Sequence, residues 1–591
     1  MSFCRHIFLN YSEYVLTNLK IYDKIQNKMY ACTSCYNRSF RRQIIMENYR
    51  ELKDYILPER VLKAENVCGA ENLIRYQSDI ASFLCKHPCV VAPKGYIILD
   101  FGKEYQGGVK IIAQDMMGKK NANIRVRFGE SAMECCSELG QKGSTNDHSV
   151  RDERLQLPWI GCLEYGMTGY RFIRVDNYDD VSISLVQVLG ISVHSGKEYK
   201  GSFVCSDDTI NRVWEASAYT LYLNNNKYIT DGIKRDRLVW IGDMHPETIS
   251  VLRLFGDDPS VRRSLDYIRD ETELPLWMNG IPSYSMWWCK IQRDLYLYTG
   301  DKEYLAKQLP YIKKLCRLLT DCVKPDGTIG IDYKFIDWPS STQPSAQSLG
   351  IRSLLVVSLR SCLEILHVFG DASCDESVEK ALKVLSSHTL EKSDNKQAVS
   401  LAVFAELLSA KQAEAEILSK DPLSGLSTFL CYYVMQARAK AGAMQGALDI
   451  IRKYYGAMLD LGATTMWEDF DLEWAKNAKP IDALLGEGEY DVHGDNGGYC
   501  YKGYRHSLCH GWAAGTVSFA TEYILGIKVA EVGCKKITVS PDLGDLQWAE
   551  GTFPTPYGNV WVRAEKKNGQ TDVQYKAPEQ VKVSIINKED K

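Results

Sequence analysis

Hydrophobic residues recur with different periods in different parts of the chain. Between about residues 60 and 200, apolar and polar positions alternate, and Ile124, Val126 and Phe128 are separated by arginines. Alternation of period two predicts strands with one buried face in a half-buried antiparallel sheet. We therefore expect a β-sandwich within an N-terminal region 1–204, although the first 60 residues show no clear pattern.

The period changes near Ser206, where Ser206 or Asp207 can cap a helix. Roughly a dozen helical stretches follow, with few strands between them. They lie near 206–221, 244–255, 260–270, 284–299, 302–321, 345–368, 375–388, 396–420, 424–441, 443–459 and 507–525. Paired helices joined by loops predict stacked helical hairpins that close on themselves over 205–528.

The last 60 residues return to alternation. Two apolar-polar runs flank Asn568-Gly569, which is a strong signal for a β-hairpin. The sequence therefore predicts a small C-terminal β-sandwich domain at 529–591. No low-complexity linker separates the three regions, so we expect tightly docked domains.

Composition excludes several classes of partner. The formal net charge is -4 and no basic run is interleaved with aromatics, so we expect neither nucleic acid nor an anionic membrane as a partner. No apolar run reaches the roughly 18 residues of a membrane span, and the first residues lack the apolar core of a signal peptide.

The 19 cysteines are odd in number and follow no disulfide framework. Cys32 and Cys35 form one CxxC without a second pair that would complete a zinc site. We interpret most cysteines as reduced thiols, which predicts a reducing, cytoplasmic compartment.

Acidic and aromatic residues are concentrated between the expected helices. In DGIKRDRLVWIGD at 231–243, three carboxylates, two arginines and a tryptophan lie close together. Asp236 and Asp243 are seven residues apart, so a helix would place them on one face. A salt-bridged helix start is the structural alternative, but two glycines and an LVWI run disfavour an exposed helix. The other segments are 275–288, FIDWP at 335–339, ATTMWEDFD at 463–471, and 493–512 with its histidines.

Other chemistries fit less well. The chain contains no GxSxG, HExxH or GxxxxGK[ST] motif and no convincing metal-ligand spacing. We expect neither a cofactor nor a metal. Carboxylates and aromatic side chains on the loops of a helical barrel suit cleavage of a glycosidic bond, in which one acid protonates the leaving oxygen and a base activates water.

At these motifs the sequence resembles glycoside hydrolase family 78, the α-L-rhamnosidases. The matching motifs, in order, are DGIKRDRLVWIGD at 231–243, WMNGIPSYSMWW at 277–288, DW at 337–338, ATTMWED at 463–469 and SLCHGWAAG at 507–515. The likeness extends over most of the chain, including both β-regions. It implies an (α/α)6 barrel flanked by β-domains and hydrolysis of terminal α-L-rhamnosyl residues with inversion, on a rhamnose-containing glycoside or oligosaccharide.

The resemblance also implies roles for individual residues. Asp236 matches the general acid and Glu468 the general base. Further matching residues would hold the sugar or organise the acid: Asp231, Arg235, Trp240, Asp243, Trp287, Asp337, Trp338, Trp467 and His510. The better-known family pattern has glutamate at the acid position, and aspartate is one methylene shorter. Glu247 is therefore the second candidate for the acid.

Two other functions stay open at this stage. One is a barrel glycosidase or lyase for another, acidic sugar, which would replace the carboxylate pair with uronate-binding Arg and Lys. The other is a catalytically weak or inactive sugar-binding protein on the same scaffold. Hydrolysis of p-nitrophenyl α-L-rhamnoside separates these functions from the leading one.

Overall fold

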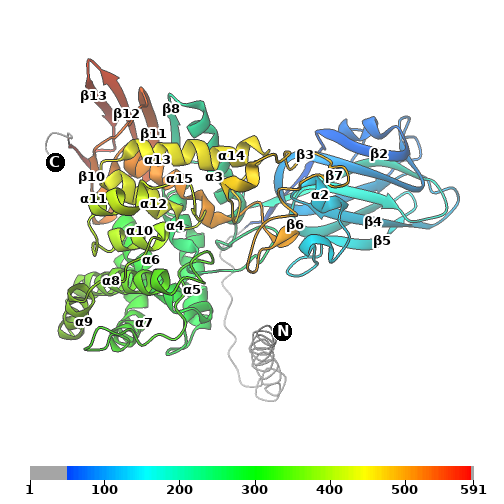
Figure 1. Ribbon diagram of the computed structural model, residues 1–591. Helices are drawn as coiled ribbons and strands as arrows, with labels where there is room; N and C mark the ends of the chain where they lie inside the picture. The colour runs from blue at the N-terminus through cyan, green and yellow to red at the C-terminus, as the bar shows by residue number, and fades with distance from the viewer. Residues whose placement is uncertain (1–49, 587–591) are drawn as a thin grey trace. The chain divides into compact units, whose positions relative to one another are not determined.

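The fold is that of a computed structural model, which describes residues 50–586 (Figure 1). Residues 51–591 form one compact unit. Strands come first, helices follow and strands return at the end, which confirms the predicted order of β, α and β regions. The CxxC at Cys32 and Cys35 lies outside the described residues.

The N-terminal strands form one hydrogen-bonded sheet of seven strands in the order β1-β7-β3-β6-β4-β5, with β2 paired to β3. The long strand β3 pairs with β2, β6 and β7 along its length and so connects most of the sheet. The strands are β1 Leu52–Ile56, β2 Arg60–Cys68, β3 Cys89–Ala113, β4 Asn121–Gly129, β5 Asp152–Pro158, β6 Cys162–Asn177 and β7 Ile183–His194.

The predicted alternation in β4 is confirmed, because Ile124, Val126 and Phe128 are all buried in one core. The expectation of a solvated polar face is wrong at this strand, since Arg125 and Arg127 are buried as well. Both arginines are paired with carboxylates, and the short helix α2 (Ala132–Cys136) packs against β4. Period two identifies the two faces of a strand but not what covers the polar face.

The helical region runs from α3 to the turn that ends at Ile524, and within the described range 50–586 no sheet strand interrupts it. Its predicted helices are confirmed, mostly to within a few residues. The main helices are α3 Asp208–Asn224, α4 Met244–Leu254, α5 Pro259–Glu271, α6 Pro282–Thr299, α7 Lys302–Asp321, α8 Pro344–Val368, α9 Asp375–Ser387, α10 Lys396–Phe404, α12 Cys431–Lys440, α13 Met444–Ile450, α14 Gly456–Asp460 and α15 Thr516–Phe519. The side chain of Asp207 caps α3, as one of the two predicted caps.

The C-terminal strands form two small sheets. The order β13-β12-β11-β8 places β8, which precedes the helical region, beside strands that follow it, and the other sheet is β14-β10-β9. Asn568 and Gly569 have φ of 50° and 82°, as the hairpin turn between β12 and β13 requires. The strands are β8 Ser202–Cys205, β9 Ile527–Glu531, β10 Lys536–Val539, β11 Trp548–Thr555, β12 Gly558–Lys567, β13 Gln570–Lys576 and β14 Lys582–Ile585.

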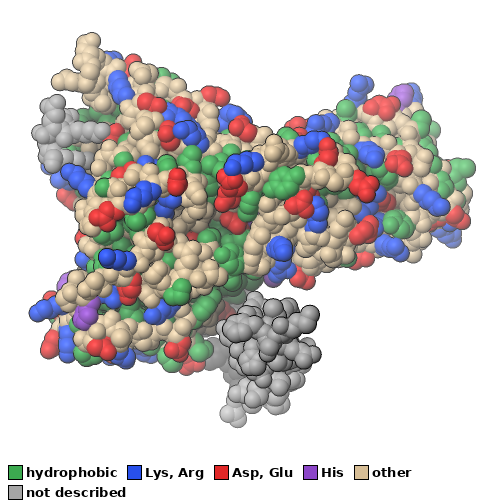
Figure 2. Space-filling view, viewed as in Figure 1, with side chains coloured by type: hydrophobic (Ala, Val, Ile, Leu, Met, Phe, Trp, Pro, Cys, Tyr) green, Lys and Arg blue, Asp and Glu red, His purple; other side chains and the backbone are tan. Residues whose placement is uncertain are grey.

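The 16 cysteines among the described residues are free thiols. None of the described helices is both long and apolar enough to cross a membrane. On the face seen in the space-filling view, basic and acidic side chains are interspersed (Figure 2), in keeping with the small net charge.

Candidate active site

The segment 231–243 leaves α3 and enters α4 as a loop. The prediction that Asp236 and Asp243 share a helix face is therefore wrong. The carboxylate of Asp231 accepts the backbone N–H groups of Asp236 and Leu238, each at 2.8 Å. These bonds fold the loop around Asp231, and Arg237 adopts a positive φ of 60° within it. The loop is shaped by a side chain that replaces the missing backbone partners.

One guanidinium connects the two predicted catalytic carboxyl groups. Arg235 Nη2 is ion-paired with Glu468 Oε1, and Arg235 Nη1 lies 3.7 Å from Asp236 Oδ1. Glu468 retains 2% side-chain exposure and Asp236 16%. The pair thus consists of one enclosed carboxylate and one carboxyl group that reaches solvent.

Two loops from distant parts of the chain hold Glu468. Its backbone N–H donates to the carbonyl of Ser507 at 3.0 Å, and the N–H of Ser507 donates to Glu468 Oε2 at 2.9 Å. Trp512 Nε1 donates to the Glu468 carbonyl oxygen at 2.9 Å. Burial raises the pKa of Glu468, and the Arg235 guanidinium opposes that rise. The side chain is therefore fixed in place with a cation that favours its ionised form.

His510 lies between the two acidic groups of the site. Its Nε2 is 3.8 Å from both Asp231 Oδ2 and Glu468 Oε1, so these oxygens are at most twice that distance apart. Burial lowers the pKa of His510 well below its usual value, with Arg235 adding to the effect. A neutral imidazole at this position can accept or donate a hydrogen bond to a hydroxyl without adding charge.

Three further carboxyl groups are buried beside the loop. Burial, with the nearby Asp236 charge, raises the pKa of Asp231 to about 7. Burial and neighbouring carboxylates raise the pKa of Asp243 and Glu247 well above their ordinary values. Tyr284 donates to Asp243 at 2.9 Å, whereas the two Glu247 oxygens lack a hydrogen-bond partner among the described residues. Burial therefore favours the protonated forms of these groups, although Asp231 is still about half ionised near pH 7, and in the protonated form each can donate a hydrogen bond to a sugar oxygen.

Aromatic rings form a continuous row beside the carboxyl groups. Trp240 Nε1 donates to Asp236 Oδ2 at 3.1 Å. From Trp240 the ring centroids follow one another to Tyr284 at 6.1 Å, to Phe335 at 6.2 Å, to Trp338 at 5.1 Å and to Tyr499 at 5.7 Å. Tyr499 is 48% exposed, so the row runs from the acid to solvent. Such a row offers ring faces for a sugar and its attached group.

Three predicted site residues are placed differently. Trp287 is 1% exposed and stacks on His245 at 4.8 Å and on Tyr433, so it packs in the core and is not part of the aromatic row. Trp467 is equally buried and packs edge-on to Phe470. Asp337 is buried and accepts the N–H of Ser340 at 2.9 Å. This bond helps to fold the loop that carries Trp338, whereas the other oxygen of Asp337, Oδ2, has no hydrogen-bond partner among the described residues.

The N-terminal sheet contributes a buried charge network that the sequence did not point to. Lys234 Nζ lies 3.0 Å from Glu130 Oε2 and 3.1 Å from Glu134 Oε1. Glu130 in turn accepts the N–H of Leu508 at 2.6 Å and the hydroxyl of Ser507 at 3.2 Å. Burial alone would lower the pKa of Lys234, but the two glutamates outweigh it and raise that pKa. The network thereby fixes the segment that holds Glu468.

Glu130, Glu134 and His493 place potential metal-ligand atoms within 4.8 Å of one another. The ammonium group of Lys234 already contacts both carboxylates at 3.0 and 3.1 Å. His493 is engaged with Ser131 at 2.8 Å and with the carbonyl of His506 at 2.9 Å. A lysine therefore supplies the positive charge that a cation would supply.

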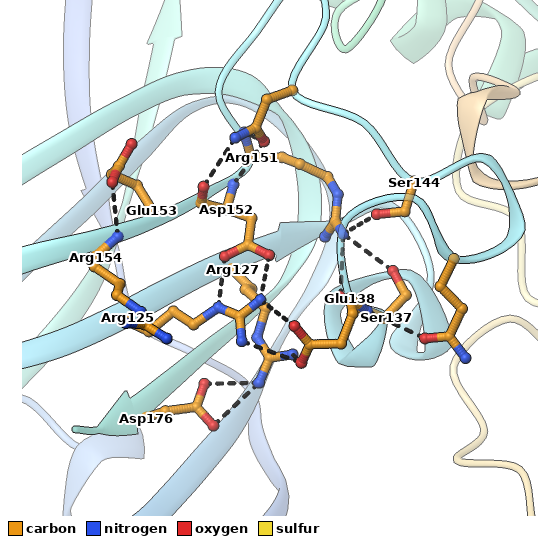
Figure 3. Close-up of polar contacts among 12 residues, drawn as sticks. Arg125, Arg127, Ser137, Glu138, Ser144, Arg151, Asp152, Glu153, Arg154 and Asp176 are labelled. Carbon is orange, nitrogen blue, oxygen red and sulfur yellow. Dashed lines mark hydrogen bonds and ion pairs between the residues drawn. The ribbon is translucent and has the colours of Figure 1, made fainter.

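The loop between α2 and β5 brings His148 to the acid, with His148 Nε2 at 3.1 Å from Asp236 Oδ1. Arg151 anchors this loop by donating to the carbonyls of Phe128, Glu134 and Ser137. Arg125 adds an ion pair to Asp152 (Figure 3). His148 and Glu130 lie outside the motifs recognised in the sequence, whereas Lys234 lies inside the motif at 231–243 but was not given a role. Tyr284 lay inside a recognised motif and could have been chosen.

Two segments match models of known domains. Residues 198–377 match the bacterial alpha-L-rhamnosidase six-hairpin glycosidase domain, and residues 526–591 match the bacterial alpha-L-rhamnosidase C-terminal domain. Two segments of the chain are therefore similar to domains of bacterial α-L-rhamnosidases. The predicted resemblance to glycoside hydrolase family 78 is confirmed.

Similar proteins extend this likeness beyond the two segments. An alpha-L-rhamnosidase of Alteromonas sp. (strain LOR) is 25% identical over 556 residues, covering 83% of this chain and 56% of that protein. The family 78 rhamnosidase structure from Bacillus sp. GL1 superposes with a TM-score of 0.69 at 22% identity, covering 88% of this chain and 56% of that one. A Klebsiella oxytoca rhamnosidase with rhamnose bound gives a TM-score of 0.63 at 19% identity, covering 80% of this chain and 96% of that one. The chain spans a little over half the length of the first two.

Proposed function

We propose that the protein hydrolyses terminal α-L-rhamnosyl residues from glycosides or oligosaccharides with inversion at the anomeric carbon. The similarity to α-L-rhamnosidase domains supports the reaction class, and the rhamnose bound to the similar Klebsiella oxytoca structure supports the sugar. The observation that carries the proposal is the Arg235 guanidinium, which joins an enclosed carboxylate at Glu468 to a partly exposed carboxyl group at Asp236.

The proposed architecture is an (α/α)6 barrel with the site at one mouth, flanked by a β-sandwich domain within the N-terminal region 1–204 and by a small C-terminal β-sandwich domain at 529–591. The uninterrupted run of helices between β8 and β9 supports the barrel. The loops before α4 and α8, the first turn of α6 and the loop after α14 all supply residues of the site, which supports a single mouth.

In the proposed reaction, protonated Asp236 gives its proton to the glycosidic oxygen as the bond to the anomeric carbon breaks. Glu468 takes a proton from a water molecule, and the resulting hydroxide oxygen bonds to the opposite face of that carbon. The products are the free alcohol and β-L-rhamnose, and solvent exchange then reprotonates Asp236 and deprotonates Glu468. An inverting pair needs a separation of roughly 6.5–9.5 Å between the carboxyl groups to admit the water.

Other residues would bind the sugar in this scheme. Protonated Asp231 and Asp243 offer donors to hydroxyl groups, and neutral His510 offers either a donor or an acceptor. Trp240 and Trp338 supply apolar faces. Rhamnose carries a methyl group where a hexose has CH2OH, which suits such apolar walls.

The test is a panel of p-nitrophenyl glycosides with the α-L-rhamnoside, the α-L-fucoside and the α-L-arabinoside. We expect the rhamnoside to be cleaved at least about 100-fold faster, and Glu468→Gln to reduce that rate by at least about 1000-fold. Glu473→Gln is a matched control, because Glu473 lies five residues away with a 69% exposed side chain. Rhamnose binding without hydrolysis would instead identify an inactive sugar-binding protein and refute the proposal.

A further inference from the structure

A second cavity lies inside the helical region, beyond the candidate active site. It has a volume of about 300 Å³ and is lined by α4, α6, α12 and β9. Along α6, Tyr284 bonds to Asp243 in the site, Trp287 follows one turn later, and Ile291 and Asp294 line the cavity. Positions three and four apart share a helix face, so the site and the cavity occupy successive levels of the same inner face.

A layer of stacked rings marks the boundary between the two levels. Trp287 stacks on His245 at 4.8 Å and on Tyr433 at 5.4 Å, and all three side chains are buried. His245 also forms part of the cavity wall. Interiors pack without gaps that a ligand could cross, so occupants of the two levels do not compete directly.

The cavity wall carries an excess of positive charge, with five lysine or arginine side chains against two carboxylates. Both carboxylates are already engaged. Asp294 is bound by Lys290 at 2.5 Å and by His245 at 3.0 Å. Glu522 is ion-paired with Arg253 and accepts the hydroxyl of Tyr432 at 3.0 Å.

Lys440 and Lys528 lie at this cavity with exposed side chains. Lys440 forms no ion pair with any residue that the structure describes, and its ammonium lies 5.8 Å from the Phe404 ring. Lys528 lies 4.3 Å from the Tyr523 ring. Partial burial, together with the like charge of Lys528, lowers the pKa of Lys440, and a bound anion would relieve that repulsion.

The rest of the lining combines apolar walls with one unused polar group. Ile249, Leu252, Leu297 and Val529 lie in the wall. Thr248 also lies in the cavity wall; it is 1% exposed, and its buried hydroxyl oxygen has no hydrogen-bond partner among the described residues. Buried hydroxyl groups are normally bonded, so this hydroxyl is available to a ligand in the cavity once its side chain turns toward it.

We propose that this cavity binds a small organic carboxylate, with its charged group at Lys440 and Lys528 and its apolar body against Leu252 and Phe404. The volume is at the lower limit of the roughly 300–1,000 Å³ typical of ligand pockets, which limits the ligand to about one ring. A simple inorganic anion would leave the apolar walls unused. This inference does not depend on the proposed glycosidase activity.

The probes are benzoate, its neutral counterpart benzamide, and inorganic phosphate, titrated calorimetrically against the full chain. We expect benzoate to bind at least about tenfold more tightly than benzamide or phosphate, since one charge interaction of about 1.4 kcal/mol corresponds to tenfold. Saturating rhamnose should leave benzoate binding unchanged. Equal affinity for benzoate and benzamide, tighter binding of phosphate, or displacement by rhamnose would each overturn the proposal.

Variants locate the site. The double variant Lys440→Gln with Lys528→Gln should weaken benzoate binding at least about tenfold, and both side chains are exposed, so the fold should tolerate the change. Lys453→Gln is the matched control, because Lys453 is 59% exposed and lies outside the cavity. Thr248→Val keeps the shape of the side chain and should weaken benzoate binding without changing the charge of the cavity wall. Wild-type affinity in the double variant would overturn the assignment.

Discussion

Arg235→Gln isolates the electrostatic control of the proposed base. The guanidinium of Arg235 is ion-paired with Glu468, and the two side chains retain 6% and 2% exposure. Burial raises the pKa of Glu468 and Arg235 opposes the rise. An adjacent opposite charge lowers the pKa of a carboxyl group, so removal of the Arg235 charge should raise the pKa of Glu468 further.

The sign of the effect follows from the role of the base, which acts only when ionised. A higher pKa moves the acidic limb of the kcat/KM profile to higher pH, and the rate below the new pKa falls about tenfold for each pH unit by which the limb moves. The assay is the pH dependence of kcat/KM with p-nitrophenyl α-L-rhamnoside. Part of the loss should be recovered as the pH rises.

Arg438→Gln is the matched control for this experiment. Arg438 is also buried, with 7% side-chain exposure, and also pairs with one carboxylate, Glu414 at 2.9 Å. Its removal should lower stability without moving the pH profile. An Arg235→Gln enzyme whose acidic limb stays at the wild-type pH would refute the reasoning, even if its overall rate were lower.

Three other substitutions test separate parts of the account. Asp236→Asn should reduce kcat by at least about 100-fold on natural rhamnosides but much less on the nitrophenyl substrate, whose leaving group needs little protonation; parental activity on both substrates would refute this assignment and make Glu247 the next residue to test. As the pH rises from about 5 to about 8, the free energy of unfolding in urea should fall less for Glu247→Gln than for the parent. The reason is that the unfolded chain ionises this glutamate near pH 4.3, while the folded chain holds the proton to a higher pH. Parallel plots of unfolding free energy against pH for the two proteins would contradict this prediction. Glu130→Gln should lower kcat about tenfold and move the acidic limb of the kcat/KM profile, with little change in KM, because Glu130 orients the segment that holds Glu468. An unchanged pH profile would show that Glu130 has a purely structural role.

The sequence was most informative where structure depends on local periodicity. The helices and most strands recur at positions set by apolar spacing, and Asn568-Gly569 forms its turn because both residues tolerate positive φ. The burial of Arg125 and Arg127 was not predictable, since their carboxylate partners come from other segments of the chain. Alternation reports which residues share a face, and tertiary contacts decide whether that face is solvated.

The candidate site was predicted only in part, for a similar reason. Arg235, Asp236 and Glu468 lie in motifs, and the structure brings them together. The conformation of their loop depends on hydrogen bonds to Asp231, which residue spacing does not reveal. Trp287 could not be distinguished from the ring-row tryptophans, because a core tryptophan and a binding tryptophan look alike in a motif.

The contacts that the N-terminal region makes with the site could not be predicted from the sequence. Glu130, Lys234 and His148 are separated in the sequence and meet only because the sheet contacts the helical region. Buried charges such as these are retained only with partners, so their pairing becomes visible once the partners are placed. A search for charged residues next to expected strand ends could have suggested Glu130, which follows β4 directly.

The most direct test of the central claim is proton NMR of the sugar released at the start of the reaction. The purified protein is mixed with p-nitrophenyl α-L-rhamnoside, and the anomeric signals are followed before mutarotation equilibrates them. Inversion at a site built on Asp236 and Glu468 predicts that β-L-rhamnose appears first and the α anomer only later. Initial release of α-L-rhamnose, or no release of rhamnose at all, would contradict the account.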